Sequence, residues 1–87
     1  MSAAPTTAEI ERILLVEISG MFPENPDITV STSIQTLGLD SLRLFELCVL
    51  IEKEFGLSLL DGPLTRDTLE NIASLAAHIA ARLATKG

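Results

Sequence analysis

Hydrophobic residues recur at steps of three and four in three segments of this 87-residue chain, which is the spacing of one face of an α-helix. The first segment begins at Ala8, where Thr6 or Thr7 can cap a helix, and it ends before the helix-breaking Pro23 and Pro26. Its apolar positions are Ile10, Ile13, Leu14, Ile18, Met21 and Phe22. The pattern predicts an amphipathic helix that turns one stripe toward a core.

The second segment, Leu42–Phe55, has two apolar stripes. It contains no Gly or Pro, and Gly56 follows it as a residue that ends helices. One stripe consists of Leu44, Leu47, Cys48, Ile51 and Phe55, and the other of Leu42, Phe45 and Val49. A helix with so wide an apolar arc buries one stripe in the core, which makes the second stripe available to a partner.

The third predicted helix has two possible starts. Its apolar positions are Leu69, Ile72, Ala76, Ile79 and Leu83. Asp67 with Glu70 resembles a capping box, whereas Asn71 could cap a helix that begins at Ile72. We expect this helix to end at about Ala84.

The connection between the first two helices, residues 24–40, is long for so small a domain. Its aliphatic residues argue against disorder and favour packing over the helices; they are Ile28, Val30, Ile34, Leu37 and Leu39. A strand at Ile28–Val30 is a competing interpretation, but the sequence offers no second strand to pair with it. One further short helical turn could lie at Leu64–Leu69.

The predicted fold is therefore all-α: a small four-helix bundle of three main helices and one short helix, with a long loop between the first and second helices. Residues 8–84 would form one domain between a flexible N-terminus, residues 1–7, and a C-terminal tail, residues 85–87.

Composition excludes several classes of function. Twelve acidic and six scattered basic residues give a net charge of −6, which argues against nucleic acid and suits basic protein partners. A single Cys rules out an internal disulfide framework and a multi-Cys zinc site, so we expect no metal centre. Met1–Thr7 lacks the basic region of an export signal, and no run of about 18 apolar residues occurs. We expect a cytoplasmic, monomeric protein that does not enter a membrane.

The candidate functional motif is LGLDSL, residues 37–42, where the long loop meets the central helix. Gly38 permits a turn that a residue with a Cβ atom would resist. Asp40 or Ser41 occupies the N-cap position. An arbitrary Asp-Ser pair before a helix more often does nothing but cap it.

This motif, followed by Glu46-Leu47 and the helix end IEKEF (51–55), resembles the LGxDSLxxxEL pattern of the acyl carrier protein family, and the resemblance extends over essentially the whole chain. It implies that Ser41 is the attachment point of 4′-phosphopantetheine, which a phosphopantetheinyl transferase takes from coenzyme A with Mg²⁺. Acyl groups would then be carried as thioesters on the thiol of this arm. The flanking Asp40 and Leu42 would belong to the same site, with Asp40 serving in capping and in recognition by the transferase.

The residues themselves support this placement, because a serine at a helix start is exposed and a phosphodiester there lies at the positive end of the helix dipole. The resemblance also implies contacts with partner enzymes at Leu42, Arg43, Phe45, Glu46, Val49, Glu52 and Lys53. The expected partners are the transferase, an acyl-loading ligase or acyltransferase, and a ketosynthase or other condensing and tailoring enzymes. The competing interpretation is that these residues are ordinary core and solvated-surface positions. No catalysis by the chain itself is expected.

Two basic residues set this chain apart from fatty-acid carriers. Arg43 and Lys53 stand where that group is usually acidic, so residues 40–55 carry four acids and two bases. This departure favours a specialised pathway, such as polyketide biosynthesis. The alternatives are a free-standing peptidyl carrier, although Leu39 gives the acyl-type motif rather than Gly-Gly-Asp/His-Ser, and a non-catalytic helical interaction module.

Two other chemically versatile side chains are predicted to be inert. Cys48 lies on an apolar helix face, which favours a buried thiol. His78 lies off the apolar stripe of the last helix, which predicts a surface position. His78 forms no recognisable catalytic pair with Ser41.

Overall fold

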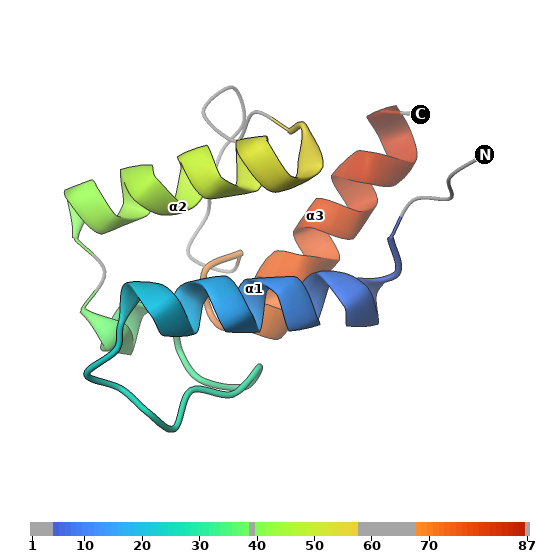
Figure 1. The fold of residues 1–87 in the computed structure, drawn as a ribbon. Helices are drawn as coiled ribbons and strands as arrows, with labels where there is room; N and C mark the ends of the chain where they lie inside the picture. The colour runs from blue at the N-terminus through green and yellow to red at the C-terminus, as the bar shows by residue number, and fades with distance from the viewer. Residues whose placement is uncertain (1–4, 39, 58–67, 87) are drawn as a thin grey trace.

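The computed structural model describes residues 5–38, 40–57 and 68–86 (Figure 1). Its elements are α1 (Thr7–Met21), the short 3₁₀ helix η1 (Gln35–Leu37), α2 (Ser41–Phe55) and α3 (Ile72–Lys86). These parts of the chain contain helices joined by loops and turns, with no strand, which confirms the predicted all-α bundle of three main helices. The short helical turn predicted at Leu64–Leu69 falls largely outside the described residues.

Helix α1 begins where a capping box forms. The Thr6 hydroxyl accepts a hydrogen bond from the Glu9 amide at 3.1 Å, and the Thr6 amide donates to the Glu9 carboxylate at 2.8 Å. Of the two caps that the sequence allowed, Thr6 is the one used, and Thr7 is the first residue of α1 rather than part of a tail. At the other end the Phe22 amide donates to the Ile18 carbonyl at 3.1 Å, and Pro23 follows.

The start of α3 is decided by Asn71. Its side-chain oxygen accepts a hydrogen bond from the Ser74 amide at 2.7 Å, which is the geometry of an N-cap. Of the two starts that the sequence allowed, the structure has the one before Ile72, and Asp67 lies outside the described residues. The helix continues to Lys86, two residues past its expected end.

The predicted apolar stripes meet in one core. α1 packs closely against α3, and α2 runs antiparallel to α1 across the bundle (Figure 1). The fully buried large side chains are Phe22, Ile10, Leu14, Ile18, Ile34, Leu47, Ile51, Ile72, Leu75 and Ile79. Burial of this aliphatic surface is the main term that holds the helices together.

The long loop packs over the helices, as its aliphatic content predicts. Ile34 and Leu37 are buried in the core, and Val30 packs against it. The Val30 carbonyl accepts a hydrogen bond from the Ala73 amide at 3.0 Å, so the loop satisfies a donor in the first turn of α3. The Thr32 amide bonds back to the Thr29 carbonyl at 3.0 Å. This segment is therefore a turn tied to α3.

Candidate functional site

Ser41 is the first residue of α2, and it is exposed. The helix begins there because Asp40 caps it: the Asp40 carboxylate accepts a hydrogen bond from the Arg43 amide at 2.8 Å. The Asp40 carbonyl accepts the Leu44 amide, also at 2.8 Å. Since Asp40 is the N-cap, capping does not involve the Ser41 hydroxyl.

The position of Ser41 is set by the end of the loop. Ile34 and Leu37 anchor η1 in the core, and Gly38 then turns the chain with a φ of 90°. A Cβ atom at Gly38 would meet no other atom within 4 Å, so the requirement for glycine there is conformational. Leu39 lies outside the described residues. A buried anchor therefore stands only four residues before the exposed serine.

Arg43 fixes the first turn of α2 against the end of α1. Its guanidinium donates a hydrogen bond to the Met21 carbonyl and lies over the Phe22 ring, 4.7 Å from the ring centroid. The last turn of α1 contains no basic residue of its own. Arg43 thus supplies a positive charge at the C-terminal end of α1, where the helix dipole favours it. This intramolecular role was not foreseen from the sequence, which assigned Arg43 to partner contacts.

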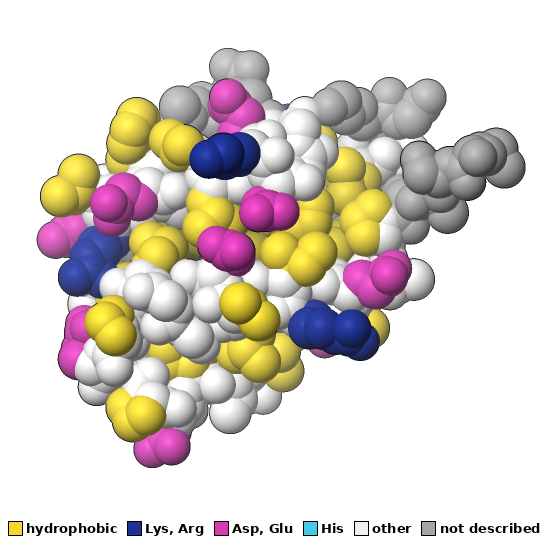
Figure 2. Space-filling model, viewed as in Figure 1, with side chains coloured by type: hydrophobic (Ala, Val, Ile, Leu, Met, Phe, Trp, Pro, Cys, Tyr) yellow, Lys and Arg dark blue, Asp and Glu magenta, His cyan; other side chains and the backbone are white. Residues whose placement is uncertain are grey.

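The second apolar stripe of α2 lies on the surface. Leu42 exposes 67%, Phe45 53% and Val49 46% of its side chain. Glu46, Glu52 and Lys53 are exposed on the same helix, and Figure 2 shows acidic and hydrophobic side chains interspersed over α2 and along its border with α1. The structure therefore brings six of the seven predicted contact residues to the surface, whereas Arg43 is half-buried. That they contact partners stays a prediction.

The first turn of α2 fits a phosphodiester on Ser41. The opening amides of a helix have no acceptor within the helix, and the dipole places partial positive charge there. Asp40 carries the same sign as a phosphodiester and offers no attraction, and the Arg43 guanidinium faces α1. The favourable field at Ser41 therefore comes from the backbone of α2.

The remaining versatile side chains form no second site. Cys48 is 3% exposed, and burial raises the pKa of its thiol above the usual value, as expected for an inert cysteine. The prediction for His78 was wrong: it is half-buried, and its Nε2 atom is buried without a hydrogen-bond partner. Within the described ranges no three His, Cys, Asp or Glu side chains gather as metal ligands. None of the described helices has the length and apolarity to cross a membrane.

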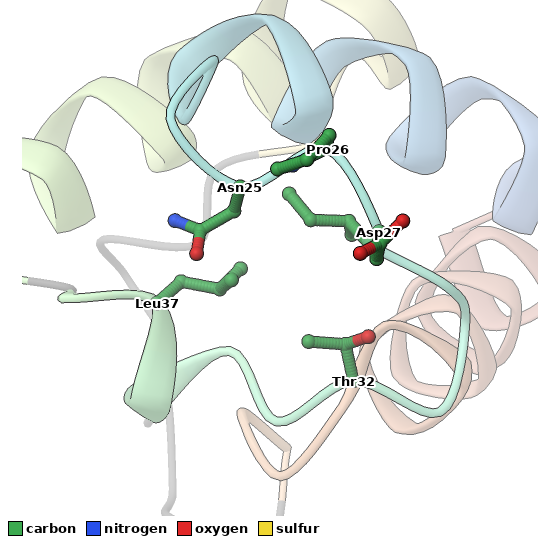
Figure 3. A pocket seen from close by; sticks show the side chains of 6 residues that line it. Asn25, Pro26, Asp27, Thr32 and Leu37 are labelled. Atoms are coloured by element: carbon green, nitrogen blue, oxygen red, sulfur yellow. The ribbon is translucent and has the colours of Figure 1, made fainter.

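A hollow of about 130 Å³ lies inside the long loop, and no pattern in the sequence predicts it. Its lining residues are Asn25, Pro26, Asp27, Ile28, Thr32 and Leu37 (Figure 3). Leu37 lies on its wall, so one side of the anchor before Ser41 borders solvent-accessible space.

Comparison with known proteins identifies the family of the chain. The family described as "Phosphopantetheine attachment site" matches residues 10–79, which run from α1 through Ser41 into α3. The monensin polyketide synthase acyl carrier protein of Streptomyces virginiae is 39% identical over 66 residues, which cover 75% of each chain. No solved structure matches. The chain belongs to the family of phosphopantetheine-binding carrier proteins, whose cofactor is covalently attached 4′-phosphopantetheine.

Proposed function

We propose that this protein is an acyl carrier that holds intermediates of a polyketide pathway on a 4′-phosphopantetheine arm at Ser41. The observation that carries the proposal is an exposed serine at the first position of α2, placed there by a buried loop anchor and an Asp40 cap. The likeness to a carrier named for a polyketide synthase supports this pathway over the peptidyl alternative.

The contribution of Ser41 is its hydroxyl. In the attachment step the hydroxyl gives its proton to a base of the transferase, and its oxygen attacks the pyrophosphate of coenzyme A. A serine–phosphorus bond forms, and the adenosine bisphosphate leaves with the electrons of the broken phosphoanhydride bond. The arm supplies a terminal thiol on which acyl groups are held as thioesters.

The backbone of α2 stabilises the product of attachment. A phosphodiester at a helix N-terminus gains about 0.3–1 kcal/mol from the dipole when it is solvent-exposed. Asp40 acts through the cap, which holds the first turn in shape. The chain thus orients the arm and offers it to solvent, and the catalytic groups belong to the partner enzymes.

The partners in this proposal are a transferase, an acyl-loading ligase or acyltransferase, and a ketosynthase or other condensing and tailoring enzymes. The exposed stripe of Leu42, Phe45 and Val49 begins one residue after the attachment point. A partner that covers this stripe therefore lies beside the base of the arm.

Intact mass spectrometry tests the attachment. We expect incubation with coenzyme A, Mg²⁺ and a promiscuous phosphopantetheinyl transferase to add one phosphopantetheinyl group, and Ser41→Ala to abolish the gain. Ser31→Ala is the matched control, because Ser31 is also exposed and hydroxyl-bearing but lies in the loop. A gain that persists in Ser41→Ala, or no gain with several transferases, would overturn the proposal.

A further inference from the structure

The loop hollow lies between the anchor of Ser41 and a turn that is tied to α3. Leu37, which forms one wall, is buried four residues before the attachment point. Thr32, on another wall, belongs to the turn whose Val30 carbonyl accepts the Ala73 amide at 3.0 Å. Figure 3 shows the Leu37 and Thr32 side chains reaching toward each other across the hollow. A group placed between them therefore contacts both segments.

The lining of the loop hollow combines apolar groups with hydrogen-bonding groups. The Thr32 hydroxyl accepts the Thr29 amide at 2.9 Å, and its methyl group points across the hollow toward Leu37 (Figure 3). The Asn25 side chain is half-buried, and its amide makes no hydrogen bond within the described parts of the chain. Asp27 gives the lining its one formal charge, which is negative. The hollow therefore suits a neutral group that alternates short apolar units with amides, and it disfavours an anion.

We propose that the loop hollow is a resting site for the distal half of the 4′-phosphopantetheine arm, to which the arm returns between encounters with enzymes. The inference rests on the proposed attachment at Ser41. Beyond its phosphodiester the arm is uncharged, and its distal half consists of two amide groups joined by short methylene units. The methylene units match the apolar walls, and the amides match the unpaired Asn25 amide. The phosphodiester stays at the start of α2, where the helix dipole favours it.

The reach of the arm and the size of the hollow agree with this site. Leu37 and Ser41 are four residues apart, which is at most about 14 Å of fully extended chain. From the serine oxygen to its sulfur the arm has roughly the length of five extended peptide residues, about 17 Å. The hollow of about 130 Å³ is smaller than the roughly 300–1,000 Å³ of a pocket that encloses a whole ligand. It therefore holds part of the arm and leaves the rest outside.

Tethering makes a weak resting site sufficient. A group on a short flexible linker has an effective concentration in the millimolar range. A millimolar affinity for the free group therefore keeps the site about half occupied, and the arm still leaves readily for an enzyme. In Figure 1 α1 lies between α2 and the long loop, so an arm in the hollow leaves the stripe of Leu42, Phe45 and Val49 uncovered.

The first test follows the attached arm in the full chain. Protein labelled with ¹³C and ¹⁵N is converted with unlabelled coenzyme A, Mg²⁺ and a transferase, and mass spectrometry confirms one phosphopantetheinyl group. We expect nuclear Overhauser contacts from the distal methylenes of the arm to the methyl groups of Ile28, Thr32 and Leu37. Hydrogen exchange of the Ala73 amide should slow about twofold relative to the apo protein, because half occupancy holds the turn against α3.

Two outcomes of this test contradict the inference in different ways. Complete attachment with contacts confined to residues 40–43, or with contacts to the core faces of α2 and α3 instead, would overturn the resting site and leave the carrier function intact. Absence of any mass gain would overturn the attachment at Ser41 and the resting site with it.

The second test needs no attachment, because free pantetheine is titrated into the ¹⁵N-labelled Ser41→Ala protein. We expect millimolar affinity, with amide shifts at Asn25, Ile28 and Thr32. Asn25→Ala is compared with Gln35→Ala: both lose a side-chain amide, but Gln35 is exposed on η1 and does not line the hollow. Asn25→Ala should weaken binding about fivefold and Gln35→Ala should leave it unchanged.

Equal affinities in these two variants, or no shifts in the hollow at millimolar pantetheine, would overturn the inference. Shifts in the hollow that appear only when the transferase is added would assign it to a partner side chain and would also overturn the inference. If Asn25→Ala perturbs the fold, Asn25→Asp keeps the shape of the side chain and removes its donors, so it gives the same comparison.

Discussion

Two leucines on either side of Ser41 allow one chemical change to be made in opposite environments. Leu37 is 8% exposed and holds the loop in the core, whereas Leu42 is 67% exposed at the start of α2. We expect Leu37→Ala to destabilise the protein strongly and Leu42→Ala to leave its stability nearly unchanged, although the same atoms are removed in each case.

The magnitude follows from burial. Truncating a buried leucine to alanine costs about 2–5 kcal/mol. Leu37 borders the loop hollow of about 130 Å³, which is open to solvent. Water can enter the enlarged space, so the penalty for an empty cavity is reduced and the cost falls to about 2–3 kcal/mol. A chain of 87 residues has a total stability of about 4–13 kcal/mol, so this loss is a large share of it.

Thermal unfolding of the apo protein, followed by circular dichroism, measures both effects. At about 4–8 °C per kcal/mol, we expect Leu37→Ala to lower the Tm by about 10–20 °C. Leu42→Ala should stay within about 0.5 kcal/mol, a change of no more than about 4 °C. Equal shifts in the two variants, or a fall of less than about 3 °C for Leu37→Ala, would refute the assignment of Leu37 as the anchor of the site.

Four further changes test other parts of the structure. Gly20→Ala should raise the Tm by a few degrees, since a Cβ atom meets nothing within 4 Å and alanine favours the helix by up to about 1 kcal/mol; a lower Tm would contradict this. Arg43→Met should lower the free energy of unfolding, measured in urea, by about 1–3 kcal/mol, because it removes the charged hydrogen bond and the contact with Phe22. An unchanged urea midpoint would contradict a stabilising role for these two contacts. The cap hydrogen bonds lower the pKa of Glu9, so they stabilise α1 above that pKa and are lost as the pH falls through it. The amide chemical shifts of the first turn of α1 should follow this titration, and Glu9→Ala should abolish the pH-dependent change. Burial and the raised pKa of Cys48 predict slow reaction with a thiol reagent in the native protein and fast reaction in denaturant, whereas equal rates would show an accessible thiol.

The helices were predictable from sequence because their signals are periodic and local. The steps of three and four in α1 identified its buried positions Ile10, Leu14 and Ile18, and the stripe of Leu42, Phe45 and Val49 proved to be the exposed one. The start of α2 at Ser41 was also predictable, since an Asp-Ser pair before an apolar period marks a helix start by itself.

Features that depend on contacts between distant segments were not predictable. Nothing local in the sequence indicates that the Val30 carbonyl meets the Ala73 amide, or that Glu17 faces α2 across a groove. The choice between two starts for α3 also required geometry, since either Asp67 or Asn71 satisfied the sequence pattern. The surface position predicted for His78 was wrong because a residue off the main apolar stripe of a helix can still be covered by other parts of the chain.

The inward position of Arg43 changes the balance of charge on the exposed face of α2. Counted along the sequence, Arg43 and Lys53 dilute the acids of residues 40–55 and favour a specialised pathway. In the structure Arg43 turns its guanidinium to the end of α1, whereas Glu46, Glu52, Lys53 and Glu54 are exposed. The outward face of α2 therefore offers three acids against one base, and Lys53 alone remains as the surface departure from fatty-acid carriers. The Arg43 charge that holds α2 against α1 says little about which partner the surface attracts. Support for the polyketide pathway therefore comes from the likeness to a polyketide carrier rather than from charge.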